Sequence, residues 1–231
     1  MPNQLKARAI LTYVTLFLNS AIGLIYTPFL TLKLGQAEYG LYSLVASVVG
    51  SLTVLDFGFG NALIRYTAKL RAEKKEQKLK EMYGMFFIIF CGIALLALII
   101  GMVVYFNTEN IFSQNMTGEE LRKMKIMLLL MVFNLCFTFV MSVYRSIIVA
   151  YERFIFQKVI NLIRIVLNPL VMVIFLLFGY KAITMVVLQT IFNVLTLLAD
   201  YYYCKRKLNI QFVFGKFDSA FLKEVSLYSF W

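Results

Sequence analysis

The sequence contains no histidine, and only 15% of its 231 residues are charged. The absence of histidine excludes serine-histidine triads, histidine zinc sites and imidazole proton relays. Cys91, Cys136 and Cys204 show no paired spacing, so we expect neither a disulfide framework nor a metal cluster. Any chemistry must therefore use carboxylates, Lys, Arg, amides, hydroxyls or aromatic rings, and we expect no metal and no other cofactor.

Apolar side chains are abundant, since 61% of the residues are hydrophobic. Soluble chains are about 45–50% apolar and about 25% charged. Because one crossing of a bilayer takes about 20 apolar residues, this composition predicts an all-α integral membrane protein. Six apolar runs predict a bundle of six transmembrane helices, at 9–32, 41–64, 82–106, 125–149, 159–178 and 182–203.

The net charge of +11 is distributed unevenly along the chain. Eighteen of the 23 Lys and Arg residues lie at the N-terminus and in the second, fourth and sixth connections, the most basic of which is 65–81. Because Lys and Arg are enriched on the cytoplasmic side, we expect both the N- and the C-terminus to be cytoplasmic, and no nucleic-acid partner. We divide the chain into a six-helix lobe, 1–203, and a cytoplasmic linker with an interfacial amphipathic helix, 204–231.

Polar side chains in four of the predicted spans recur at intervals of three and four residues. This spacing places them on one face of each helix. Since polar groups inside a membrane normally face the protein interior or a water-filled cavity, the pattern predicts a shared hydrophilic interior. The stripes are Thr12, Thr15, Asn19, Gly23 and Tyr26; Asn134, Thr138, Ser142 and Arg145; Gln157, Asn161, Arg164 and Asn168; and Gln189, Asn193, Thr196 and Asp200.

Some polar groups in the spans have two interpretations. If the protein couples transport to protons or sodium ions, the absence of histidine leaves Asp56 or Asp200 as the group that binds the ion. A mechanism driven by the membrane potential needs neither residue. Asp56 could instead be structural, as a helix cap or the partner of an arginine. Arg164, roughly 8 Å inward from residue 159 at 1.5 Å per residue, could extend to the cytoplasmic interface. Arg65 could be a topological anchor.

Several short runs carry a resemblance to a known family. The runs 26–30 (YTPFL), 35–42 (GQAEYGLY) and 55–62 (LDFGFGNA), followed by Arg65-Tyr66, resemble the N-terminal part of bacterial polysaccharide flippases. These are the O-antigen and repeat-unit exporters of the multidrug/oligosaccharidyl-lipid/polysaccharide transporter superfamily. The run 150–154 (AYERF) and Asn168-Pro169 are similar too. The resemblance implies two six-helix lobes that alternate between inward and outward openings, and this chain matches the first lobe.

The resemblance further implies a transporter, not an enzyme, in the bacterial inner (plasma) membrane. Such proteins move undecaprenyl-diphosphate-linked oligosaccharide to the outer leaflet for surface polysaccharides such as the O-antigen of lipopolysaccharide. The implied partners are the bilayer, the lipid-linked oligosaccharide, and a second lobe or polysaccharide-assembly proteins. A diphosphate needs fixed cations and sugars need amides and hydroxyls. The candidates are Arg65, Arg145 and Arg164 for the diphosphate, and Asn19, Asn134, Asn161, Asn168, Gln189 and Asn193 for the sugars.

Three other functions stay open. A cation-coupled multidrug exporter of the same superfamily would resemble its relatives in carrying an acidic residue in the first helix, where 12–32 has none. A membrane glycosyltransferase or polymerase would need catalytic carboxylates in a loop, but the loops contain no paired-aspartate metal motif. A non-transporting assembly subunit is the third, because the chain matches only one lobe.

Overall fold

The computed structural model describes the backbone of residues 2–112 and 116–214 and the side chains of residues 12–112 and 116–214. Six helical segments are long and apolar enough to cross a membrane, and the described residues contain no strand. The predicted fold class, an all-α membrane protein with six spans, is confirmed. In chain order the elements are α1 (Pro2–Leu34), α2 (Gln36–Ser51), the 3₁₀ helix η1 (Leu52–Asp56), α3 (Phe59–Ala72), α4 (Glu76–Phe112), α5 (Gly118–Ala150), α6 (Phe154–Leu177) and α7 (Ala182–Arg206).

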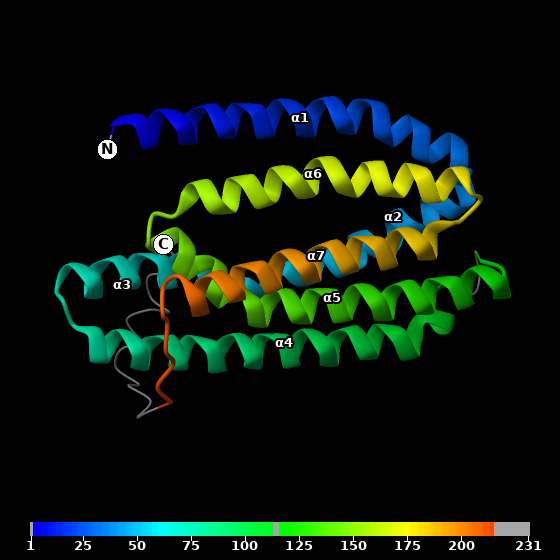
Figure 1. Cartoon of the computed structure of the whole chain (residues 1–231). Helices are drawn as coiled ribbons and strands as arrows, with labels where there is room; N and C mark the ends of the chain where they lie inside the picture. Colours follow the sequence, from blue (N-terminus) through cyan, green and yellow to red (C-terminus); the bar gives the residue numbers. More distant parts are fainter. Residues whose placement is uncertain (1, 113–115, 215–231) are drawn as a thin grey trace.

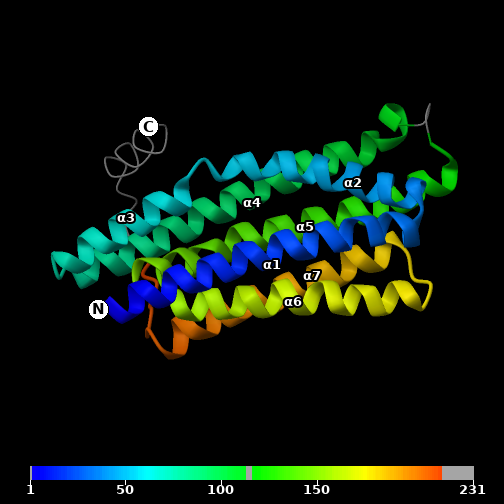
Figure 2. The same ribbon diagram turned by 90° about the horizontal axis from the view of Figure 1, so that it is seen from above.

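The long helices run side by side along one direction, so their connections collect at two ends of an elongated bundle (Figures 1 and 2). One end holds the α3–α4 turn, the α5–α6 turn and the last residue of α7 (left in Figure 1). We call it the basic end, because its connections are the ones rich in Lys and Arg. The opposite end holds the α1–α2, α4–α5 and α6–α7 connections. The uneven charge along the sequence is therefore also a separation in space.

Helix α5 lies at the centre of the packing and contacts α2, α3, α4 and α7. Its buried side chains recur every three or four residues, so one broad face of the helix is covered by its neighbours. They include Met124, Met127, Leu128, Met131, Leu135, Phe139, Val143 and Ile147. Helices α1 and α6 pack against each other and bury the smallest share of their span residues. A second, smaller core joins them to α7 at the opposite end, and it is formed by Leu30, Leu34, Met172, Leu176, Met185 and Leu188.

The second span is a broken helix. The apolar run 41–64 predicts one continuous segment, but α2 ends at Ser51 and α3 begins at Phe59, with η1 between them. Phe57 and Gly58 both adopt left-handed conformations, with φ of 46° and 76°. Glycine reaches this region without a steric penalty, which explains why the chain turns here although its hydropathy does not change.

The basic connection 65–81 is mostly helical and includes the turn between α3 and α4. Helix α3 continues to Ala72 and α4 begins at Glu76, which leaves a turn of three residues. Lys, Glu, Gln, Arg, Ala and Leu are all good helix formers, so the helices extend beyond the apolar runs that marked the spans. The most basic stretch of the chain therefore lies on ordered helix ends.

The chain after α7 returns across the start of α4. The backbone N–H of Val213 donates a hydrogen bond to the carbonyl of Lys80 over 3.2 Å, and Phe212 lies against the rings of Tyr83, Phe87 and Tyr144. The first part of the predicted linker is thus packed on the bundle. The amphipathic helix predicted within 204–231 falls on residues 215–231, which lie outside the described residues.

Candidate functional site

Asn193 is the centre of a polar network inside the bundle. Its side chain on α7 is only 7% exposed, and its Nδ2 donates to Asn134 Oδ1 at 2.6 Å and to Thr138 Oγ1 at 2.7 Å on α5. Its Oδ1 accepts a hydrogen bond from Arg164 Nη1 on α6 at 3.0 Å. One amide therefore connects three spans, and we call these four residues the Asn193 network.

The Asn193 network lies near the middle of the spans. Arg164 follows the first residue of α6, Phe154, by ten positions, or roughly 15 Å at 1.5 Å per residue. Asn134 is sixteen residues from either end of α5, or roughly 24 Å. The guanidinium of Arg164 is bonded inward to Asn193, which is not the arrangement expected if it extended to the interface.

Arg145 adds a second guanidinium beside the network. It lies on α5 and is exposed, yet its charge acts on both Arg164 and Asp200. Gln157, from the start of α6, donates to the Arg145 carbonyl at 2.8 Å. Asp200 on α7 is only 2% exposed. Arg145 therefore lies close enough to act on both the Arg164 guanidinium and the Asp200 carboxylate, and the two guanidiniums together favour an anion.

Tyr42 extends the polar region along α7. Its hydroxyl donates to Gln189 Oε1 at 2.9 Å and connects α2 to the helix turn before Asn193. The sequence analysis did not select Tyr42 or Thr138 as site residues. A buried tyrosine hydroxyl usually has a hydrogen-bond partner, so a partner for Tyr42 could have been expected. The sequence does not show that this partner is Gln189.

Two further candidates share the face of α6 that carries Arg164. Asn161 and Asn168 are half-buried there. The Oδ1 atom of Asn168 is buried and has no hydrogen-bond partner among the described residues. Because a buried acceptor without a partner is costly, this atom is a suitable place for a ligand hydroxyl to donate.

Three candidates lie away from the Asn193 network. Asn19 on α1 and Arg65 on α3 are both exposed. Asp56 lies half-buried at the break in the second span, where its carboxylate is against the backbone N–H of Gly58. This position suits the structural interpretation of Asp56, and none of the three residues contributes a hydrogen bond to Asn193 within the described structure.

The described part of the chain offers no cluster of metal ligands. Among the described side chains, no group of three or more Cys, Asp or Glu residues is arranged to hold a metal ion. The groups that the bundle interior offers to a ligand are guanidiniums, amides, hydroxyls and one buried carboxylate. These groups can bind and orient an anionic or hydroxyl-rich molecule by hydrogen bonding.

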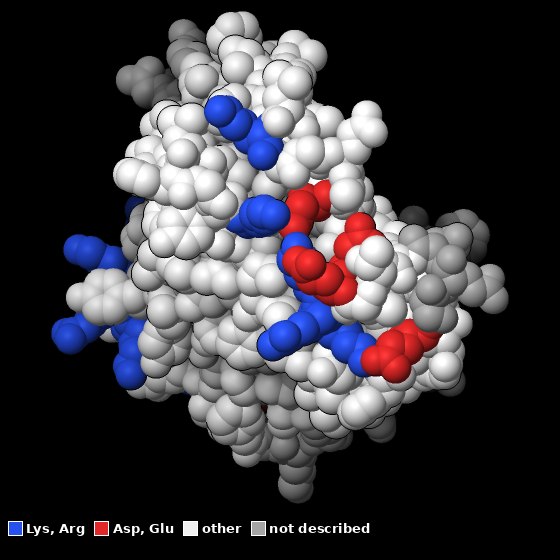
Figure 3. All heavy atoms as spheres, turned by 90° about the vertical axis from the view of Figure 1, so that its right-hand side faces the viewer, with Lys and Arg blue, Asp and Glu red and all other residues white. Residues whose placement is uncertain are grey.

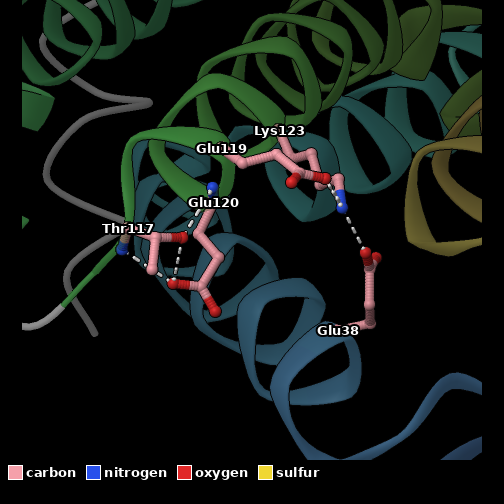
Figure 4. Close-up of polar contacts among 5 residues, drawn as sticks. All are labelled: Glu38, Thr117, Glu119, Glu120 and Lys123. Carbon is pink, nitrogen blue, oxygen red and sulfur yellow. Dashed lines mark hydrogen bonds and ion pairs between the residues drawn. The ribbon is translucent and has the colours of Figure 1, made fainter.

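A group of ion pairs centred on Lys123 lies at the opposite end of the bundle. Lys123 Nζ on α5 lies 2.7 Å from Glu38 Oε1 on α2 and 2.8 Å from Glu119 Oε1 (Figure 4). Acidic and basic side chains gather side by side on this end of the surface (Figure 3). Thr117 caps α5 by exchanging hydrogen bonds with Glu120 (Figure 4), a capping box. The pairing of Lys123 with Glu38 fixes the start of α2 against the start of α5.

Comparison with known protein families gives a match over almost the whole chain. A sequence model of the family described as "Polysaccharide biosynthesis protein" matches residues 5–231. No curated protein and no solved structure matches the chain. The matched range includes all six spans, and therefore both the Asn193 network and the Lys123–Glu38 pair.

Proposed function

The chain belongs to the polysaccharide biosynthesis protein family, and on that premise we propose that it moves a lipid-linked oligosaccharide across the membrane. Membership of the family and six membrane-capable helices make it a multi-pass membrane protein with a role in polysaccharide synthesis or export. The proposed substrate is undecaprenyl-diphosphate-linked oligosaccharide, moved from the cytoplasmic to the outer leaflet of the bacterial inner membrane. The proposed protein is a flippase and not an enzyme, and its product supplies surface polysaccharide such as O-antigen.

The Asn193 network is the observation that carries this proposal. An arginine inside a membrane-spanning helix is costly and is by default a functional residue. Asn193 accepts a hydrogen bond from one N–H group of Arg164, and a guanidinium has five such donors. The others are suited to bind phosphate oxygens in pairs, and Arg145 supplies a second cation nearby.

The sugar part of the substrate needs neutral hydrogen-bonding groups. Asn161, Asn168 and Gln189 lie on the same faces of α6 and α7 as Arg164 and Asn193. The unpaired Oδ1 of Asn168 offers an acceptor for a sugar hydroxyl. In the proposed mechanism the sugar and diphosphate follow these polar faces while the lipid tail stays in the bilayer, so the charged groups never enter hydrocarbon.

The test uses the gene as it stands in its own genome. Deletion should remove the surface polysaccharide and cause its lipid-linked precursor to accumulate in the cytoplasmic leaflet. Complementation with Arg164→Ala should fail, whereas Arg153→Ala, at the exposed start of α6, should restore the polysaccharide at equal membrane expression.

Two outcomes would contradict the proposal. Normal polysaccharide with Arg164→Ala would remove the role of the network. Loss of polysaccharide after deletion without accumulation of the lipid-linked precursor would place the protein at another step, as an assembly subunit would be.

A further inference from the structure

A cavity at the basic end is separate from the Asn193 network. It has a volume of about 550 Å³, within the usual range for sites that bind small ligands. Its walls are the end of α3, the α3–α4 turn, the first two turns of α4, Tyr151 after α5, and residues 208–211. We call it the basic-end cavity.

The lining of the basic-end cavity is strongly cationic. Arg71, Lys74, Lys75 and Lys80 line it, and Glu76 is the one acidic residue of the lining. The N-terminal end of α4 also opens here, and the helix dipole favours an anion at that position. Arg71, Lys74 and Lys75 are exposed to solvent at the cavity, and Lys75 pairs with Glu73 just outside the lining at 2.6 Å. Arg71, Lys74 and Lys80 therefore supply most of the positive charge that a ligand would meet.

Arg71 is held in place before any ligand binds. Its Nη1 donates to the carbonyl of Ala150 at 3.1 Å, and its guanidinium carbon lies 3.8 Å from the centre of the Tyr151 ring. Contact with a ring face and a carbonyl fixes the orientation of the guanidinium plane. A preorganised cation loses less side-chain entropy on binding an anion than a free lysine does.

The wall formed by the chain after α7 is also fixed. Lys80 Nζ donates to Gln211 Oε1 at 3.0 Å, and the Val213–Lys80 backbone bond follows directly. Phe212 stacks on Tyr144 with ring centres 5.4 Å apart. The open side of the cavity is thus bordered by packed segments, one of which comes from more than 120 residues further along the chain.

We propose that the basic-end cavity binds the phosphate of an anionic lipid headgroup. The cavity lies beside residue 82, where the apolar run of α4 begins, and the edge of an apolar run is expected at the depth of the lipid headgroups. Basic pockets between membrane-spanning helices are typical binding sites for anionic headgroups. Leu70, Leu79 and Ile210 supply apolar lining beside the cations, which suits the glycerol and upper acyl chain. The lining of this site shares no residue with the Asn193 network.

The test measures binding and does not depend on transport. The purified full chain in a neutral detergent is titrated with dihexanoyl phosphatidylglycerol, with dihexanoyl phosphatidylcholine and with inorganic phosphate. The anionic lipid should bind more tightly than the zwitterionic lipid and more tightly than phosphate. Arg71→Gln with Lys74→Gln should weaken its binding by roughly tenfold or more, since each cation near a headgroup contributes to affinity.

Two further variants control for charge and folding. Lys205→Gln with Arg206→Gln removes the same two charges at the same end, from α7 residues that do not line the cavity, and should leave binding within about twofold. Arg71→Lys with Lys74→Arg keeps the charge and should retain most of the affinity. The proposed site would be overturned if the Lys205/Arg206 control pair weakened binding as much as the Arg71/Lys74 pair does. It would also be overturned if phosphatidylcholine bound as tightly as phosphatidylglycerol. If inorganic phosphate bound as tightly as phosphatidylglycerol, the site would bind phosphate but would not be specific for a lipid.

Discussion

The guanidinium of Arg164 in α6 is bonded to the side-chain carbonyl of Asn193 in α7 over 3.0 Å. Helices α1 and α6 are the least buried spans, and the small core that joins them to α7 lies at the opposite end. Away from that core, the contacts between α6 and α7 include this bond and the stacked rings of Phe156 and Tyr203, 3.9 Å apart. The same group that is proposed to bind substrate therefore also contributes to the packing of α6 on the bundle.

Replacement of Asn193 should be destabilising. Asn193→Leu keeps a similar volume but removes three interhelical hydrogen bonds and leaves Arg164 without its acceptor. We expect the free energy of unfolding to fall by roughly 1–3 kcal/mol, measured by unfolding in detergent micelles. Thr196→Val is the matched control, because Thr196 Oγ1 bonds the Phe192 carbonyl of its own helix. A loss no greater than that of the control would mean that the network does not join the helices.

The Lys123 bridge predicts a difference between two neighbouring lysines. Lys123 pairs with Glu38, whose side chain is 12% exposed, whereas Lys125 pairs with Glu109, whose side chain is 66% exposed. Lys123→Gln leaves a mostly buried carboxylate without its cation, but an exposed pair contributes little. We therefore expect a clear fall in Tm for Lys123→Gln and almost none for Lys125→Gln, at the same ionic strength.

Measuring Tm at low and high salt distinguishes loss of the Lys123–Glu38 pair from a general effect of removing one positive charge. Raising the ionic strength screens exposed charges more than partly buried ones. The difference in Tm between the two variants should persist at high salt. If it disappears there, the Glu38–Lys123 pair acts only as a surface pair and does not fix α2 against α5.

Apolar runs were enough to predict the spans, and the periodicity of polar residues placed all four members of the network on polar stripes. Asn134, Arg164 and Asn193 each belong to a polar stripe, and the structure brings three of the four stripes together. Periodicity gives the face of a single helix, however, and not the helix that it meets. The bonds from Tyr42 to Gln189 and from Lys123 to Glu38 join residues 147 and 85 positions apart, so neither could be derived from local spacing.

The break in the second span was not predicted from hydropathy, although the two glycines after Asp56 indicate that the helix could be loosened there. Hydropathy reports how apolar a segment is, and the residues from Leu52 to Phe59 are apolar enough to continue a span. The turn depends on the backbone angles of Phe57 and Gly58, which hydropathy does not contain. The helical form of the connection 65–81 has a similar cause, since charged residues that end an apolar run are still good helix formers.

Gly84 should be required for the chain after α7 to stay docked. A Cβ at this position would overlap the backbone carbonyl of Val213, whereas a Cβ at Gly92 on the same helix meets nothing within 4 Å. We expect Gly84→Ala to release residues 208–214 and to cost roughly 1–3 kcal/mol by overpacking. Gly92→Ala should be neutral or stabilising by up to about 1 kcal/mol, because alanine favours the helix.

Cys204 reports this release directly. It is fully buried and lies beside Ile210 and Phe212. In a Cys91→Ala, Cys136→Ala background, maleimide labelling of Cys204 should be slow in the parent and with Gly92→Ala, and faster with Gly84→Ala. Unchanged labelling with Gly84→Ala would show that residues 208–214 tolerate the added carbon without leaving α4.

The last prediction concerns two glycines at the break in the second span. Gly58 has φ of 76°, where a residue with a Cβ costs about 1–2 kcal/mol, so Gly58→Ala should lower the free energy of unfolding by about that amount. A Cβ at Gly60 would lie 3.4 Å from Ser146 Oγ, an ordinary contact, so Gly60→Ala should stay within about 0.5 kcal/mol. Equal stability of the two variants, compared by unfolding in micelles, would mean that the second span is continuous. Asp56 would then lie on an unbroken helix, without the exposed backbone N–H that its carboxylate approaches.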